Sequence, residues 1–184
     1  MKKNVIVFGL IAGLMVSIWL GIVVGMCMNG KIHLDNGMLY GYASMILAFS
    51  MVFVGVKNYR DKYCGGIISF GQAFKTGLFI TLIASTIYVL VWLVSYYTLI
   101  PNFFEVYSEN YLSGLKAGGA SQEVMAEEMA SMAKYAEWYK NPLFVVGATY
   151  MEILPVGLVV TLVSALLLKR KGTRVATDLQ GVGR

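Results

Sequence analysis

The sequence has little of the side-chain chemistry that metal and thiol enzymes need. Its 184 residues include two cysteines, Cys27 and Cys64, and one histidine, His33. Zinc sites need several sulfur or imidazole ligands close together, and the chain has no CxxC motif or Cys/His cluster. We expect His33 to be a solvated loop residue. The sequence therefore predicts no metal, no cofactor and no thiol redox chemistry.

Charged residues are scarce as well. They make up 14% of the chain, whereas hydrophobic residues make up 58% and the mean hydropathy is +0.67. Soluble domains carry about 25% charged residues, and a soluble chain of this size could not bury so much apolar surface. The composition predicts an integral membrane protein that lies in the lipid bilayer. The net charge of +5 is then explained by membrane topology, and we expect no nucleic-acid partner.

Four apolar stretches are long enough to cross a bilayer. They cover about residues 5–28, 38–56, 76–100 and 143–168. Met1–Lys3 resembles the start of a signal peptide, but the apolar stretch that follows is too long and has no A-x-A cleavage site. We expect an uncleaved first span. Pro101 disfavours helix in the residue before it and is expected to end the third span.

Lysine and arginine lie mostly on one side of this topology. They gather at the N-terminus, in the connection after the second span (Lys57–Lys75) and after the fourth span. The other side holds only Lys31, Lys116, Lys134 and Lys140, together with most of the acidic residues. The positive-inside rule then places both termini in the cytoplasm of a multi-pass protein.

Residues 101–142 form the largest region outside the predicted spans. Two apolar faces recur there at helical spacing, one with Phe104, Tyr107, Tyr111 and Leu115, the other with Met125, Met129, Met132, Ala136 and Tyr139. Glycines separate them, and Ser121 is placed to cap the second helix. We predict an acidic helical hairpin at the outer boundary. Thioethers can bind Cu(I), but methionine more often fills an adaptable apolar face.

The first predicted span carries a small residue at every fourth position. These residues are Gly9, Gly13, Ser17, Gly21 and Gly25. Such a stripe lets a second helix approach closely, so that packing and weak hydrogen bonds hold the pair together. The pattern predicts helix packing, and it leaves open whether the partner helix belongs to the same chain or to a second copy.

Glu152 and Pro155 are the unusual residues of the fourth span, because no other acid or proline is predicted inside a span. A charged side chain at mid-membrane costs at least about 2.5 kcal/mol. Protonation, hydrogen bonding or contact with water would relieve this cost. Pro155 removes one helical hydrogen bond and predicts a kink. The side chains expected at the same depth are Ser17, Ser44, Tyr88, Trp92 and Ser95.

Two interpretations of this pair stay open. In one, Glu152 is a proton or cation site at a hinge, since membrane carboxylates often mark transport paths. In the other, it is a neutral, hydrogen-bonded carboxyl that stabilises the bundle. The second interpretation is favoured, because transporters normally have more polar spans and often internal repeats, whereas this chain has four spans with a single acid.

Two long stretches, residues 41–92 and 139–171, resemble a family of small bacterial four-helix membrane proteins that is catalogued as a domain of unknown function. The segment Gly65–Lys75, with the sequence GGIISFGQAFK, carries the most specific part of the likeness. The resemblance reaches to about Lys171 and implies a bacterial inner membrane. It implies no activity and therefore no catalytic residue.

We predict an all-α, integral membrane four-helix bundle over residues 1–171, with an extracytoplasmic helical hairpin between the third and fourth spans. Residues 172–184 are expected to be a disordered cytoplasmic tail. The sequence contains no Ser/His/Asp set, no Cys/His pair and no metal cluster, so we do not expect an enzyme. The leading hypothesis is a non-enzymatic accessory or scaffold bundle that acts through lipid, a membrane-protein partner or a second copy. The alternative is a small transporter or channel subunit that uses Glu152.

Overall fold

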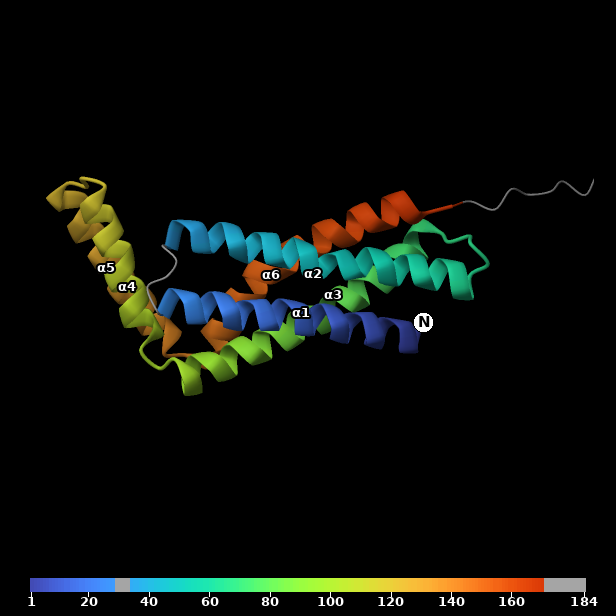
Figure 1. Ribbon diagram of the computed structural model, residues 1–184, viewed down its shortest axis with the longest axis horizontal. Helices are drawn as coiled ribbons and strands as arrows, with labels where there is room; N and C mark the ends of the chain where they lie inside the picture. The colour runs from blue at the N-terminus through green and yellow to red at the C-terminus, as the bar shows by residue number, and fades with distance from the viewer. Residues whose placement is uncertain (29–33, 171–184) are drawn as a thin grey trace, which may run out of the picture.

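The computed structural model describes residues 1–28 and 34–170, and these residues form helices joined by short connections (Figure 1). In chain order the elements are α1 (Lys2–Met28), α2 (Leu34–Tyr63), α3 (Phe70–Val94), the π-helix η1 (Ser95–Leu99), α4 (Phe103–Ala117), α5 (Gln122–Tyr139) and α6 (Pro142–Leu168). His33 and the predicted tail, residues 172–184, lie outside the described residues.

The long helices α1, α2, α3 and α6 run alongside one another, and each is long and apolar enough to cross a membrane. The hairpin of α4 and α5 lies at the end of the bundle opposite the N-terminus (Figure 1). The prediction of an all-α membrane bundle with a helical hairpin between its third and fourth long helices is confirmed.

Two helices extend beyond the predicted spans. α2 continues to Tyr63 and α3 begins at Phe70, so the connection expected over Lys57–Lys75 is only a few residues long. The start of α3 is fixed by a capping box, in which Ser69 Oγ accepts from the Gln72 N–H at 3.3 Å and Gln72 Oε1 accepts from the Ser69 N–H at 3.4 Å. Hydropathy marks the lipid-crossing part of a helix, whereas backbone hydrogen bonding continues into water.

The core lies where the four long helices approach most closely. Its side chains include Ala12, Phe49, Val52, Ile80, Ala84 and Ile153, all almost fully buried. Glycines set the spacing: an added Cβ at Gly55 would lie 2.6 Å from Ile80 Cδ1, and one at Gly77 would lie 2.9 Å from Thr161 Cγ2. Small residues at these positions allow close backbone approach, which is how membrane helices gain packing energy.

The stripe of small residues on α1 divides into two parts. An added Cβ would lie 2.8 Å from Ile83 Cβ at Gly9 and 2.7 Å from Ile87 Cδ1 at Gly13, so this part packs against α3 of the same chain. Ser17 is buried, with no hydrogen-bond partner for its hydroxyl among the described residues. At Gly21 and Gly25 an added Cβ would meet no atom of the described residues within 4 Å. The close contact is therefore confined to the half of α1 nearer the N-terminus.

Candidate functional site

An aromatic cluster joins the hairpin to the long helices. We call it the aromatic junction, and its members are Trp92, Tyr96, Phe103, Phe104, Tyr107, Tyr139 and Phe144. The rings of Trp92 and Phe103 meet edge to face at 5.1 Å, and Tyr139 lies 5.6 Å from Phe144. Aromatic pairs of this kind contribute about 0.5–1.5 kcal/mol beyond their buried area. The junction therefore holds both ends of the hairpin against α3 and α6.

Local sequence signals explain where the hairpin helices begin and end. Pro101 follows η1, and its ring prevents the helix from continuing through this point. Gly119, at φ +79°, allows the turn after α4. Ser121 Oγ then accepts a hydrogen bond from the Val124 N–H at 3.3 Å, so the predicted cap of α5 is confirmed. Asn141 caps α6 in the same way through the Leu143 N–H at 3.0 Å.

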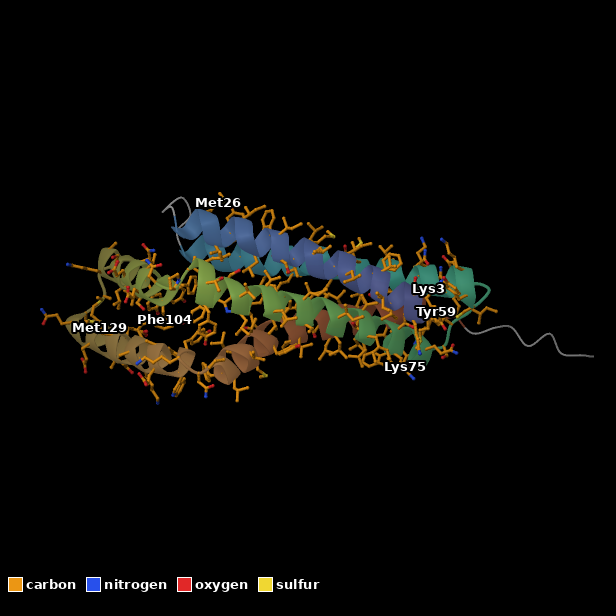
Figure 2. All side chains as sticks on the ribbon, turned by 90° about the horizontal axis from the view of Figure 1, so that it is seen from below. Lys3, Met26, Tyr59, Lys75, Phe104 and Met129 are labelled. Carbon is orange, nitrogen blue, oxygen red and sulfur yellow. The ribbon has the colours of Figure 1, made fainter. Side chains whose placement is uncertain are left out.

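A shallow, open groove of about 450 Å³ runs between α4 and α5. It is lined by Pro101, Phe104, Glu105, Ser108, Glu109, Leu112, Met129, Met132, Ala133 and Ala136. Figure 2 shows Phe104 and Met129 on the two helices of the hairpin. No residue of either helix is fully buried, and Met129 is 56% exposed. The two apolar faces predicted from the sequence therefore meet only in part and leave their methionine and aromatic side chains accessible.

The rim of the groove is acidic. Glu105 and Glu109 line it from α4, are exposed, and form no ion pair with the described part of the chain. The lysines on and just after α5 interact with other groups: Lys140 Nζ pairs with Glu137 Oε2 at 2.6 Å, and Lys134 Nζ lies 5.0 Å from the centre of the Trp138 ring. The groove thus combines an apolar floor with uncompensated negative charge.

Two tyrosines of the aromatic junction lie outside the spans. Burial raises the pKa of the Tyr107 hydroxyl, with a smaller effect from the neighbouring Tyr111. Burial also raises the pKa of Tyr139, and the next largest cause is the negative charge of Glu152. Both hydroxyls therefore hold their protons more tightly than a tyrosine in water, and Tyr139 lies within electrostatic range of Glu152.

Glu152 is exposed at the surface of the bundle and lies on α6 near Tyr88 of α3. Tyr88 itself is 5% exposed. Glu152 accepts no hydrogen bond from the residues that the structure describes. Of the other residues expected at its depth, Ser44 donates to the carbonyl of Gly41 at 2.6 Å, within its own helix. Glu152 thus lies within electrostatic range of two tyrosines, Tyr88 and Tyr139, and forms no ion pair with the described residues.

Pro155 lies within α6, which continues as one helix from Pro142 to Leu168. Its neighbours on the buried face are Ile153 and Gly157, and the carbonyl of Gly157 accepts a hydrogen bond from Thr81 Oγ1 at 3.4 Å. The proline is itself exposed. The region around Pro155 is therefore held by packing against α3 on one side and is open on the other.

Sequence reasoning found the hairpin but missed the groove and the aromatic junction. The groove depends on how far the two amphipathic helices splay, and helical spacing alone does not report that separation. A usable signal was the density of aromatic residues around the two ends of residues 101–142. Among the described residues, no group of three or more His, Cys, Asp or Glu side chains is placed to hold a metal ion.

A family model described as "Protein of unknown function (DUF4199)" matches residues 7–170. No curated protein and no solved structure matches the chain.

Proposed function

The chain belongs to the DUF4199 family, whose function is unknown, and we propose that it is a non-enzymatic accessory protein of the bacterial inner membrane. In this proposal the four long helices anchor the protein, and the groove between α4 and α5 binds a helical segment of a partner protein. Both termini lie in the cytoplasm, as the distribution of lysine and arginine favours, so the groove faces the extracytoplasmic side.

The observation that carries this proposal is the groove itself. Two amphipathic helices outside the spans leave Phe104, Leu112, Met129 and Met132 lining an open surface. Exposed apolar surface of this kind marks interaction sites, and flexible methionine side chains adapt to a bound apolar face. A groove of about 450 Å³ is large enough for side chains along one face of a helix, not for a folded domain.

The chemistry of the partner follows from the rim. Glu105 and Glu109 are exposed carboxylates without an ion pair among the described residues, so they favour lysine or arginine beside the apolar face of the bound helix. The proposed occupant is therefore a basic amphipathic helix, bound in the helix-in-groove mode. Charge complementarity of this kind mainly sets specificity and the rate of association.

Binding of a synthetic peptide to the purified protein in nanodiscs tests the proposal. The probe is a helical peptide with a leucine face and a lysine face, and its control is a scrambled peptide of equal charge. We expect only the amphipathic peptide to bind. Binding should weaken about tenfold in Glu105→Gln/Glu109→Gln, since two partly exposed charge pairs contribute on the order of 1 kcal/mol or more together.

The matched control is Glu123→Gln/Glu127→Gln, which removes the same charge from α5 outside the groove lining. It should bind the peptide with nearly unchanged affinity. Equal weakening in both variants, or equal binding of the scrambled peptide, would show that only net charge matters and would overturn the groove as the binding site.

A second candidate function is supported by the position of Glu152. Its carboxylate lies near Tyr88, in the long helices, and near Tyr139, at the end of α5. The carboxylate of Glu152, with the hydroxyl of Tyr88 in the long helices and that of Tyr139 at the outer boundary, could pass a proton or hold a cation between the spans and that boundary. Proton flux in proteoliposomes distinguishes the two functions. A transporter should show flux in the wild type and none in Glu152→Gln, whereas an accessory bundle should show no flux in the wild type or in the variant.

A further inference from the structure

At the end of the bundle opposite the hairpin, cationic side chains surround one carboxylate. Arg60 Nε lies 2.6 Å from Asp61 Oδ1, and Lys57 and Arg170 lie within electrostatic range of the same carboxylate. Lys57 and Arg60 belong to the last turns of α2, whereas Arg170 follows α6. Residues far apart in the sequence therefore form one cluster.

A backbone contact fixes the position of Arg170. Its N–H donates to the carbonyl of Ile68 at 2.9 Å, which joins the end of α6 to the connection between α2 and α3. Ile68 itself is buried, and so is Leu168, two residues before Arg170. Arg170 is thus held by buried neighbours although its own side chain is exposed.

Arg60 is unusual for a cation at the end of a membrane helix. Its side chain is only 9% exposed, whereas that of Asp61 is 43% exposed. The pair is made through Nε, and the terminal amino groups Nη1 and Nη2 donate no hydrogen bond to the part of the chain that the structure describes. A guanidinium can donate five hydrogen bonds in a planar fork. Most of this capacity is left for a group from outside the chain.

The charge at this end is strongly unbalanced. Lys2, Lys3, Lys62, Lys75 and Lys169 lie at the same end of the bundle outside the cluster, and Asp61 is the only acid that the described residues contribute here. Figure 2 shows Lys3, Tyr59 and Lys75 together at this end of the molecule. The bundle ends here at the boundary between lipid and water, where phosphate groups of the lipids lie.

We propose that Arg60, Arg170 and Lys57 form a binding site for the phosphate group of an anionic phospholipid. The guanidinium groups of Arg60 and Arg170 donate to the phosphate oxygens, and Lys57 adds charge. Arginine suits this role because its fork matches phosphate geometry. The site lies at the opposite end of the bundle from the groove, so its test does not depend on the proposed function.

Lipid-dependent thermal stability of the full chain tests this site. The protein is reconstituted in nanodiscs of phosphatidylcholine alone or with added phosphatidylglycerol. We expect the anionic lipid to raise the unfolding temperature. Half-saturation should need about tenfold more phosphatidylglycerol in Arg60→Gln and in Arg170→Gln, since each variant loses charged hydrogen-bond donors to the phosphate. Arg60→Lys keeps the charge but loses the fork, and should lie between wild type and Arg60→Gln.

The matched control is Lys62→Gln, which removes a charge from the same turn of α2 without an interaction with Asp61. It should respond to phosphatidylglycerol as the wild type does. Equal loss of the response in Lys62→Gln and Arg60→Gln would reduce the effect to net charge and overturn the proposal. Stabilisation by inorganic phosphate in phosphatidylcholine nanodiscs would also overturn it, because the site would then bind free phosphate. If Arg60→Gln does not fold, Arg170→Gln and Arg60→Lys decide.

Discussion

The hydroxyl oxygens of Thr81 on α3 and Thr161 on α6 lie 2.8 Å apart inside the bundle. Both residues are fully buried, and Thr81 also donates to the carbonyl of Gly157 at 3.4 Å. This polar contact lies beside Gly77, whose missing side chain brings α3 close to Thr161. Close approach and hydrogen bonding therefore act at the same place.

Replacing both threonines by valine should reveal a coupling between them. Hydrogen bonds between membrane helices contribute about 0.6 kcal/mol on average and up to about 1.7 kcal/mol. We expect a coupling in this range from a double-mutant cycle of Thr81→Val, Thr161→Val and the double variant. The measurement is the free energy of unfolding in mixed detergent micelles. Strict additivity of the two single changes would contradict the contact.

The two parts of the small-residue stripe on α1 should differ in their tolerance of alanine. An added Cβ at Gly9 would lie 2.8 Å from both Cβ and Cγ2 of Ile83, and a branched side chain cannot move away at its Cβ. We expect Gly9→Ala to destabilise the bundle by about 1–3 kcal/mol. Thermal unfolding in detergent measures the change.

Gly21→Ala is the control for this prediction. An added Cβ at Gly21 meets no atom of the described part of the chain within 4 Å, and alanine has the higher helix propensity by about 1 kcal/mol. The substitution should be neutral or stabilising. A loss of stability as large as that of Gly9→Ala would mean that a second copy or another partner packs against Gly21.

The sequence predicted those parts of the fold that depend on local patterns. Long apolar stretches predicted the four long helices, and Ser121 predicted the start of α5, because each signal lies within a few neighbouring residues. The placement of Arg60 and Arg170 around the same carboxylate, that of Asp61, and the groove beside Met129 depend on how separate helices are rotated and spaced. The small-residue stripe predicted close packing, but hydropathy and spacing do not tell which of Gly9 and Gly21 faces another helix.

The same argument applies to Glu152. Its depth could be estimated from its distance to the end of the span, and Tyr88 was among the residues expected there. Tyr139 was not, because α5 returns to the bundle only through the contacts of the aromatic junction. Neighbours supplied by a distant helix are the part of a site that one sequence does not reveal.

Alkaline titration should detect the raised pKa values of Tyr107 and Tyr139. Tyrosine in water has a pKa of about 10, and burial in the folded chain favours the neutral hydroxyl. The stability contributed by these groups is therefore fully present below about pH 10 and is lost as the pH rises through the folded pKa values. Ultraviolet absorbance of tyrosinate, recorded as the difference between wild type and Tyr107→Phe or Tyr139→Phe, isolates each residue.

The unfolded protein is the reference for this titration. In denaturant the same difference curves should return to a midpoint of about pH 10. Identical midpoints in the folded and unfolded protein would show that neither hydroxyl is buried in the aromatic junction.

Cysteine labelling should place the hairpin outside the cytoplasm. Cys64, in the short connection after α2, is a free thiol at the cationic end of the bundle. A Cys27→Ser protein keeps Cys64, and a Ser113→Cys variant without native cysteines carries one thiol on the exposed surface of α4. Because lysine and arginine favour the cytoplasmic side, a membrane-impermeant maleimide should label Cys64 only after the membrane is opened. The same reagent should label the Ser113→Cys variant in intact cells.

Full labelling of both proteins in denaturing detergent confirms that each thiol is reactive, and the reverse pattern in intact cells would invert the proposed topology.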